Sequence, residues 1–311
     1  MSSSDASDGS SVRVICGPTA AGKSAIAMAL AQLHGAVIIS ADSRQIYRGF
    51  DIGTAKPSVA DQRLVPHRGI DVVEPLERYS AARWAKGVQG WITEARGLGR
   101  EPLVVGGTGF YLRALVEPLF ESPPLDPERR AALERLFATT STDDLRRWCL
   151  RLDPERAHLG RVQLARSVET ALLTGERLSD LHRSRAQAPT IRARYLVVDP
   201  GATLAARIEA RYDAMMAAGW ADEVRSLTGV VDPSAPAWKA SGYRVVRDLV
   251  ENRVSERAAR EQVIIETRQY AKRQRTWFRH QLPAESVTRV SPDDRNAGTI
   301  VSAWWEGRTA E

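Results

Sequence analysis

The chain alternates short apolar runs with longer stretches in which apolar residues recur at helical spacing. The apolar, strand-like runs lie at 12–16, 36–39, 102–105 and 194–198. The stretches with helical spacing lie at 24–33, 79–95 and 203–218. Continuous apolar strands that alternate with helices are typical of a parallel sheet covered by helices on both faces. We therefore predict an α/β fold built around such a sheet.

A different pattern begins after Pro123-Pro124. The chain there becomes rich in Arg, Leu and Glu at helical spacing and contains no strand-like run. Asp126 and Ser141 stand where helices would begin, since Asp and Ser are favoured N-cap residues. The pattern predicts an all-helical insertion domain in the α/β core. The predicted boundaries are 121–190 for the insertion and 12–120 with 191–311 for the core.

Composition excludes several classes of protein. No apolar run approaches the ~18 residues that span a membrane. The Ser- and Asp-rich start, 1–11, lacks the apolar core of a signal peptide, so we predict a disordered tail on a cytoplasmic protein. The two cysteines, Cys16 and Cys149, are far apart, which excludes a cysteine-based zinc site and gives no sign of a disulfide framework.

The charge balance bears on the partner. The formal net charge of +6 favours a polyanion, and the excess of Arg over Lys suits bidentate phosphate contacts. A GC-rich genome that prefers arginine codons would give the same bias. Composition therefore favours nucleic acid without requiring it.

One loop predicts the ligand class. The eight residues after the first predicted strand match the phosphate-binding pattern G-x-x-x-x-G-K-[ST], and a predicted helix follows them. Such a loop wraps backbone N–H groups around a phosphate, with the lysine at the outer phosphate and the hydroxyl on Mg²⁺. The pattern predicts a di- or triphosphate ligand but does not settle which one. The predicted binding residues are Gly17, Pro18, Thr19, Ala20, Ala21, Gly22, Lys23 and Ser24.

Two further polar loops follow predicted strands. Asp42 lies after the second strand, where its carboxylate would bind Mg²⁺ through water, accept a proton, or merely cap a helix. Gly106-Gly107-Thr108-Gly109 follows the third strand and allows close backbone approach, while Thr108 supplies a hydroxyl. Because ligands gather at the carboxyl ends of parallel strands, we expect all three loops to converge on one crevice.

The segment 267–279 has no acidic residue and interleaves cations with three aromatic residues. As a helix it would form a rail for a phosphate backbone, with groups on which bases stack. The alternative is a solvated helix whose aromatic residues face the core. Both hold if Trp277 and Phe278 are buried and the cations are exposed.

These motifs together resemble the tRNA dimethylallyltransferase family, whose members prenylate the adenosine next to the anticodon. The resemblance extends from about Val12 to Phe278, and DIGTAKP and the closing segment are specific to this family. The sequence departs from the family pattern at Arg68-Gly69, at Ser167-Val168 and at Val245. The motifs that carry the resemblance are GPTAAGKS at 17–24, SADSRQIY at 40–47, DIGTAKP at 51–57, VGGTGFY at 105–111, RVQLARSVE at 161–169, TGERLS at 174–179, the GW..EV set at 219–224, GYR at 242–244 and TRQYAKRQRTWFR at 267–279.

The resemblance implies transfer of a dimethylallyl group from dimethylallyl diphosphate to the exocyclic N6 of that adenosine, with release of pyrophosphate. The P-loop would hold the pyrophosphate rather than ATP, with Mg²⁺ at Ser24 and Asp42. Asp42 would be the base for N6, Thr108 would support the pyrophosphate or the flipped base, and Lys23 and Lys239 would contact the diphosphate. We expect a monomer with no obligate protein partner.

The resemblance also implies a set of tRNA contacts, spread over the P-loop core and the predicted insertion. The closing segment adds its cations to this set. The expected contact residues are Asp42, Ser43, Arg44, Gln45, Thr108, Arg130, Gln163, Leu164, Ala165, Arg166, Ser167, Lys272, Arg273 and Arg275.

Three other functions share some of these features. A small-molecule kinase of the nucleotide or shikimate type shares the P-loop and the size but does not call for DIGTAKP or the basic closing helix. A prenyltransferase that acts on free AMP is a nearer alternative, against which the helical insertion and the net charge count. A non-catalytic RNA-binding protein would not need the intact Lys23, Ser24 and Asp42.

Overall fold

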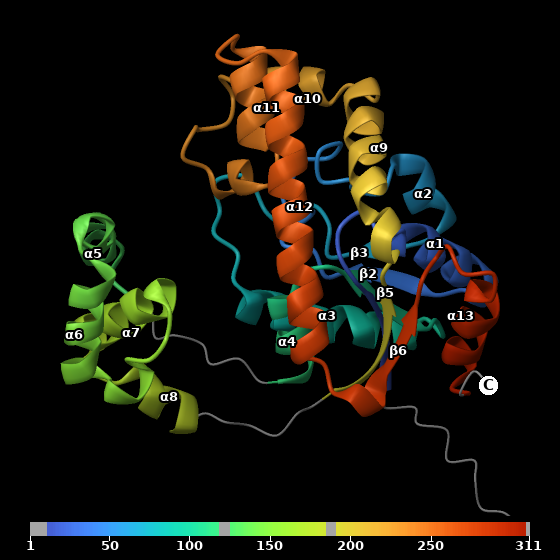
Figure 1. Cartoon of the computed structure of the whole chain (residues 1–311). Helices are drawn as coiled ribbons and strands as arrows, with labels where there is room; N and C mark the ends of the chain where they lie inside the picture. The colour runs from blue at the N-terminus through green and yellow to red at the C-terminus, as the bar shows by residue number, and fades with distance from the viewer. Residues whose placement is uncertain (1–10, 118–124, 185–190, 309–311) are drawn as a thin grey trace, which may run out of the picture. The chain divides into compact units, whose positions relative to one another are not determined.

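The computed structural model describes residues 11–117, 125–184 and 191–308, and its core is a parallel sheet of six strands (Figure 1). The strand order is β3-β2-β4-β1-β5-β6, and every pairing is parallel. The predicted α/β fold with a parallel sheet is therefore confirmed. The strands are β1 (Ser11–Cys16), β2 (Val37–Ser40), β3 (His67–Arg68), β4 (Pro102–Gly106), β5 (Arg192–Val198) and β6 (Val287–Val290).

Helices cover both faces of the sheet because successive buried strand residues point to opposite sides. Ile15, Leu196 and Val290 pack on one face with helices α1 (Lys23–His34) and α13 (Ala297–Glu306). On the other face lie α3 (Ala81–Gly97) and α4 (Gly109–Val116), which contact each other. Helix α3 also contacts strand β4, and helix α4 also contacts the long helix α12 (Glu256–His280). A short α2 (Val59–Leu64) precedes β3.

The helices that build a second apolar cluster lie beyond the carboxyl ends of the strands (Figure 1). The cluster contains four fully buried aromatic side chains, Phe50, Trp220, Trp238 and Tyr243. The cluster joins the long helix α12 to the loops that follow β2. The helices that build it are α9 (Leu204–Ala217), α10 (Trp220–Leu227), α11 (Tyr243–Val250) and α12 (Glu256–His280).

The chain divides into two compact units: residues up to Val116 together with Ile191 onward, and Glu117–Thr190 between them. The second unit has its own core, which includes Phe137, Leu145 and Val168, and its described residues contain no strand. Asp126 and Ser141 accept backbone N–H groups at the starts of two of its helices, as the sequence predicts. The helices of this unit are α5 (Pro127–Thr139), α6 (Thr142–Leu152), α7 (Arg161–Thr174) and α8 (Leu178–Ser184).

The predicted disordered tail, 1–11, falls outside the described residues except for Ser11, which begins β1. The edges of the predicted insertion, near 121–124 and 185–190, also fall outside them. Within the ranges that the structure covers, no helix has the length and apolar character needed to cross a membrane.

The DIGTAKP loop, 51–57, is held by the aromatic cluster. Glu223 accepts the backbone N–H groups of Asp51 and Ile52 at 3.0 and 2.6 Å, and it also accepts the Tyr243 hydroxyl at 2.6 Å. Gly53 lies so close to the rings that a Cβ there would be 2.1 Å from Trp220 Nε1. The GW..EV and GYR motifs therefore anchor this loop beside the sheet.

This packing predicts the effect of adding one methyl group. Gly53→Ala places a Cβ against Trp220 and Tyr243, and such overpacking costs about 1–3 kcal/mol. Gly90→Ala is the matched control, because Gly90 lies within helix α3 with open space around it. This substitution should raise the free energy of unfolding by about 0.5–1 kcal/mol. Urea unfolding of the two variants checks both signs. A Gly53→Ala protein as stable as wild type would contradict the anchoring of this loop.

Candidate active site

The P-loop takes the conformation that phosphate-binding loops require. Gly17, Ala20 and Gly22 have φ of 144°, 62° and 91°, and Lys23 begins helix α1. Gly17 must be a glycine, because a Cβ there would lie 2.1 Å from the Val198 carbonyl oxygen. The loop thus directs backbone N–H groups and a helix N-terminus toward one point.

Burial lowers the pKa of Lys23. Its ammonium donates to the Pro18 carbonyl oxygen at 2.7 Å, within the P-loop itself. Desolvation, helped by the positive charge of Arg211, lowers the pKa of Lys23 to about 8, while Asp42 opposes the shift. Lys23 is therefore poised to lose or regain its proton near neutral pH, and an anion bound beside it would favour the charged form.

The register of the sheet brings the three polar loops together. Cys16, the last residue of β1, pairs with Gly106 of β4, and Ser40 of β2 pairs with Val105. The P-loop, Asp42 and Thr108 consequently follow three adjacent strand ends. The three loops therefore lie together at one edge of the sheet, as the sequence predicts.

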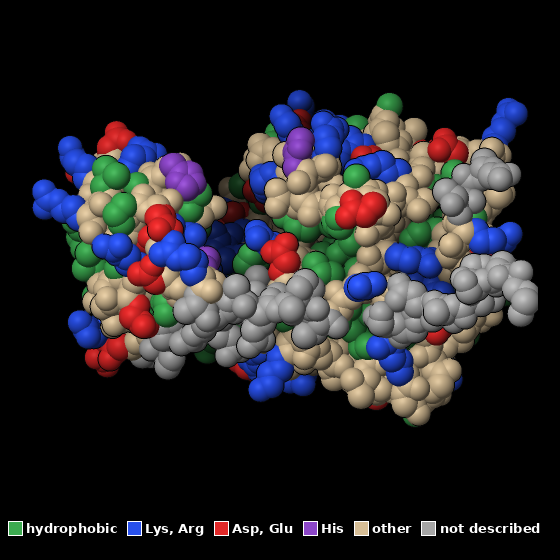
Figure 2. All heavy atoms as spheres, turned by 90° about the horizontal axis from the view of Figure 1, so that it is seen from below, with side chains coloured by type: hydrophobic (Ala, Val, Ile, Leu, Met, Phe, Trp, Pro, Cys, Tyr) green, Lys and Arg blue, Asp and Glu red, His purple; other side chains and the backbone are tan. Residues whose placement is uncertain are grey.

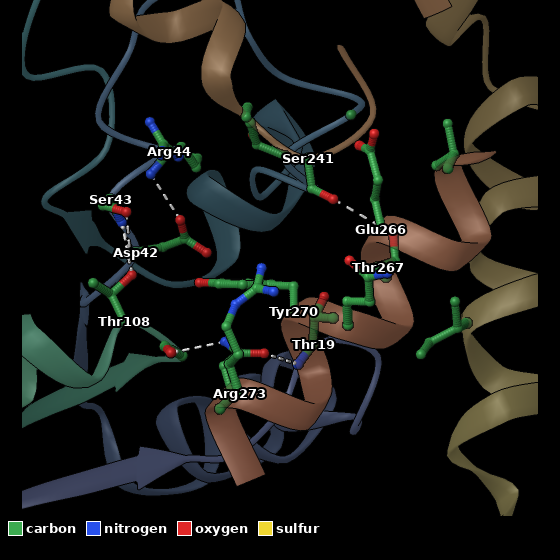
Figure 3. Close-up of a pocket in the computed structure, with 18 of the residues that line it drawn as sticks. Thr19, Asp42, Ser43, Arg44, Thr108, Ser241, Glu266, Thr267, Tyr270 and Arg273 are labelled. Carbon is green, nitrogen blue, oxygen red and sulfur yellow. Dashed lines mark hydrogen bonds between the residues drawn. The ribbon is translucent and has the colours of Figure 1, made fainter. Parts of the chain in front are cut away.

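The Asp42 carboxylate is held by its own loop (Figure 3). One oxygen accepts the Arg44 backbone N–H at 2.8 Å. Beside it, the Ser43 N–H donates to the Thr108 hydroxyl at 3.1 Å, and the Thr108 hydroxyl pairs with the Tyr270 side chain. Burial together with the negative charge of Asp42 raises the pKa of Tyr270 to about 12, so its hydroxyl stays protonated.

Helix α12 ties the P-loop to the glycine-rich loop. The buried Gln274 amide accepts the Thr19 N–H at 2.8 Å and donates to the Gly107 carbonyl at 2.7 Å. A Cβ at Gly109 would lie 2.3 Å from the Trp277 ring. The sequence suggested that these glycines admit a ligand, but Gly107 and Gly109 instead admit α12 side chains.

Two cavities adjoin at this point. One, of about 880 Å³, contains the P-loop and is here called the P-loop cavity. The other, of about 730 Å³, extends along α12 and is called the neighbouring cavity. Their shared wall consists of Thr19, Asp42, Thr54, Gly107, Arg211, Tyr270 and Gln274. Asp42 therefore faces both cavities.

Arg211 is a site residue that the sequence analysis missed. It lies on α9 in the wall shared by both cavities, and it makes no hydrogen bond or ion pair with any residue that the structure describes. Burial lowers the pKa of its guanidinium, and Asp42 opposes the shift. Its position between Ile208 and Met215, on the apolar side of an amphipathic helix, was the available signal.

Lys239 lies apart from the P-loop. It ends a short helix, Pro236–Lys239, is exposed, and lines the neighbouring cavity but not the P-loop cavity. The expected contact between Lys239 and the diphosphate therefore has no support in the geometry.

Among the expected contact residues in the first unit, Gln45 has a structural task. Its amide accepts the Ser40 hydroxyl at 2.8 Å and donates to the Thr54 and Ala55 carbonyl oxygens at 3.3 and 2.9 Å. Arg44 lines the neighbouring cavity together with Ser43. Arg44 and Ser43 thus remain accessible to a ligand, while Gln45 holds the loop.

In the second unit, two of the expected contact residues are buried. Leu164 belongs to the helical core, and the Ser167 hydroxyl accepts from Arg156 at 2.8 Å and donates to the Gln163 carbonyl. Both side chains are fully buried, so the geometry gives no support to the expectation that they touch RNA. Gln163 and Arg166 are exposed and Ala165 is half-buried, while Arg130 pairs with the buried Glu169 at 3.1 Å.

The predicted basic stripe on α12 divides into two kinds of residue. Arg268 pairs with Glu209, and Arg275 pairs with Asp199. Lys272, Arg273 and Arg279 are exposed, and no acidic residue in the described ranges pairs with them. Phe278 is buried as predicted, whereas Trp277 is only half-buried.

The face seen in Figure 2 shows no single basic patch. On the face seen in Figure 2, Lys and Arg side chains are scattered, with acidic side chains between them. The unpaired cations of α12 are therefore distinguished by their lack of acidic partners and by the cavity that Arg273 lines.

The sheet, the P-loop and the cavity around it define a P-loop α/β protein. The chain belongs to the IPP transferase family: residues 45–281 match that family, and residues 10–65 match a family described as isopentenyl transferase. The resemblance seen in the motifs is thereby confirmed.

Curated relatives and solved structures agree with this assignment. A tRNA dimethylallyltransferase from Halorhodospira halophila is 42% identical over 293 residues, which cover 91% of this chain and 94% of that protein. One from Ralstonia nicotianae is 40% identical over 298 residues, covering 90% and 92%. The crystal structure of a tRNA isopentenylpyrophosphate transferase from Bacillus halodurans has a TM-score of 0.66 at 29% identity, over 96% of this chain and 95% of that one.

A eukaryotic dimethylallyltransferase, described in its crystal structures as acting on tRNA, has the same fold. Its TM-score is 0.79 at 23% identity, and the match covers 97% of this chain and 81% of that one. At that identity the likeness bears on the fold alone.

Proposed function

We propose that this protein transfers a dimethylallyl group from dimethylallyl diphosphate to the exocyclic N6 of an adenosine next to the anticodon of tRNA. The observation that carries the proposal is the meeting of the two cavities at Asp42, with Lys23, Ser24 and most of the P-loop on one side only. A donor held by its diphosphate and an acceptor base can then approach the same carboxylate from different sides. The relatives named as tRNA dimethylallyltransferases support the same reaction.

The donor side follows from the charges around the P-loop. Backbone N–H groups of the loop, the Lys23 ammonium and the unpartnered Arg211 guanidinium all face the P-loop cavity. Together they would hold a diphosphate and stabilise the charge that develops on it as the C1–oxygen bond breaks. Arg211 would make the diphosphate contact that the family resemblance implies for Lys239.

The acceptor side needs a proton acceptor. The amino group of adenine is a weak nucleophile, because its lone pair is delocalised into the ring. As N6 forms its bond to C1 of the prenyl group, pyrophosphate leaves and N6 must lose a proton. Asp42 lies at the junction, with one oxygen fixed by the Arg44 N–H, and would accept that proton. Thr108, bonded to Ser43, would line the place of the base.

The residues at the P-loop also fit Mg²⁺. No group of three or more acidic, His or Cys side chains gathers anywhere in the described chain, but Mg²⁺ bound to a diphosphate needs only one or two protein oxygens. The Ser24 hydroxyl and the Asp42 carboxylate both line the P-loop cavity and would hold it. When bound, the ion would neutralise charge on the departing pyrophosphate.

The basic residues favour a polynucleotide over a free nucleotide as acceptor. Lys272, Arg273 and Arg279 are exposed without acidic partners among the described residues, and free AMP has no chain of phosphates to meet them. Arg44 and Ser43 line the same cavity as Arg273. From the second unit we retain Gln163, Ala165, Arg166 and Arg130 as candidate contacts.

We further propose that the protein works as a monomer in the cytoplasm, since one chain lines both cavities and both described cysteines are free and buried.

A substrate comparison tests the proposal. Labelled dimethylallyl diphosphate is offered with tRNA, with AMP, or with neither, and shikimate plus ATP is offered separately. We expect label in tRNA alone and no phosphorylated shikimate. Label in AMP, or a kinase product, would refute the proposed function.

Asp42→Asn tests the proton acceptor. The amide keeps the shape and the Arg44 hydrogen bond but cannot take the proton, so we expect the single-turnover rate to fall roughly 10²- to 10⁴-fold. The affinity for tRNA should change little, and the rate is measured at saturating donor because Asp42 is also proposed to hold Mg²⁺ at the diphosphate. A rate near that of wild type would remove Asp42 from this role.

The lowered pKa of Lys23 predicts a pH dependence of donor binding. The ligand-free protein loses the Lys23 proton as pH rises through about 8, whereas the bound diphosphate favours the charged form. The affinity for dimethylallyl diphosphate should therefore be constant below that pH and fall above it, with uptake of a proton. Calorimetry in buffers of different ionisation enthalpy measures the uptake. Lys23→Arg, which stays charged, should bind without it; proton uptake that persists in Lys23→Arg would contradict the assignment.

The division of the α12 cations predicts a difference in salt dependence. Lys272→Gln and Arg279→Gln each remove an unpaired exposed charge, so each should reduce the slope of log affinity for tRNA against log salt by about one. Arg268→Gln is the matched control. The Arg268 guanidinium is already paired with Glu209, so this substitution should change the slope less. If all three variants keep the slope of the wild-type protein, the stripe does not meet the RNA backbone.

A further inference from the structure

Phe110 is an aromatic side chain that the reaction does not use. It is the second residue of helix α4, directly after the glycine-rich loop, and 50% of it is exposed. Its neighbours Tyr111 and Leu112 are buried at 3% and 0% exposure. The half-exposed ring lines the neighbouring cavity but not the P-loop cavity, so it lies at the open edge of the acceptor side.

The backbone that carries Phe110 is fixed on both sides. Gly109, which precedes it, packs so closely on the Trp277 ring that a Cβ would be 2.3 Å from it. Tyr111, which follows it, stacks on the buried Trp84 with ring centroids 4.8 Å apart. The Phe110 ring is therefore attached to a rigid turn rather than to a mobile loop.

The surroundings of Phe110 indicate the chemistry of its partner. Trp277 and Arg273, four residues apart on α12, line the same cavity, and Lys272 is exposed beside them. Aromatic rings interleaved with unpaired cations are the usual means of binding single-stranded nucleic acid, because every base has a face that stacks. An apolar protein segment would leave these cations without a partner.

We propose that Phe110 is a stacking platform for the base that adjoins the acceptor adenosine in the RNA strand. The inference rests on the proposed function for the identity of the strand. An adenosine that enters the cavity must leave its stack, and the base next to it then loses a stacking partner. Phe110, at the edge of the cavity that the adenosine enters, replaces that partner and holds the open loop conformation.

The test measures RNA affinity in the absence of donor, so that it does not depend on catalysis. The probe is an RNA stem–loop with an adenosine-rich loop, and its dissociation constant is read by fluorescence anisotropy. Phe110→Ala should weaken binding roughly 5- to 100-fold, the range for one lost base stack, while Phe110→Tyr retains the ring and should bind like wild type. Leu98→Ala removes a comparably exposed side chain, 63% accessible, that lines neither cavity, and it should have no effect.

A second RNA series locates the contact. An abasic nucleotide is placed in turn on each side of the acceptor adenosine. With one of these RNAs, Phe110→Ala should bind no more weakly than wild type, since the stack is already lost. The inference is overturned if Phe110→Ala binds the intact RNA within twofold of wild type, or if its penalty persists with both abasic RNAs.

The same samples separate this inference from the proposed function. If wild-type protein binds the stem–loop but transfers no dimethylallyl group to it, the proposed function fails while the Phe110 comparison is still decided by affinity. If transfer occurs and Phe110→Ala binds normally, the reaction stands and the stacking platform is wrong. The thermal midpoint of Phe110→Ala, expected to match that of wild type for a half-exposed side chain, guards against loss of fold.

Discussion

The site depends on the docking of one helix against two loops. Helix α12 crosses the carboxyl ends of the strands, and its Gln274 amide uses both of its ends, one on the P-loop and one on the glycine-rich loop. A buried amide with both partners satisfied is stabilising, whereas either partner left alone would be a buried polar group without a hydrogen bond. Because Gly107 and Gly109 have no side chains, α12 can approach closely enough to make these contacts. The P-loop, Asp42 and Thr108 are thus held as one site.

The motifs that distinguish the family have mainly structural roles. Gly53 fits beneath Trp220 and Tyr243, and Glu223 ties the backbone of the same loop to the Tyr243 hydroxyl. Lys56, also in this loop, is buried and paired with Asp51 and Asp71. The groups proposed to react are few, and most of the shared sequence serves to hold them in place.

The sequence predicted the parts of the fold that local pattern determines. The apolar runs predicted four of the six strands nearly to the residue, because buried parallel strands are continuous in apolar character. The two-residue β3 was too short to show a pattern, and β6 was missed because only Val290 of its four residues is buried. The P-loop and Asp42 were found because a motif and a strand end locate them. The two hydrogen bonds of Gln274 depend on packing between segments distant in the sequence, which no local pattern records, while the sequence marked Arg211 only by its place on the apolar side of an amphipathic helix. At Lys239 and Leu164 the geometry gives the expected contacts no support, because a position in a motif does not say which way a side chain points.

The most direct test of this account replaces the bridging amide. Gln274→Met keeps the volume and removes both hydrogen bonds, while Gln262→Met, at an exposed position of the same helix that lines neither cavity, is the control. Each lost bond costs about 1–3 kcal/mol, so the affinity for dimethylallyl diphosphate should fall at least about fivefold in Gln274→Met, and the rate of transfer to tRNA should fall with it. The control should match wild type in both. If Gln274→Met binds donor and transfers the prenyl group as wild type does, the two loops do not depend on α12, and the central claim is wrong.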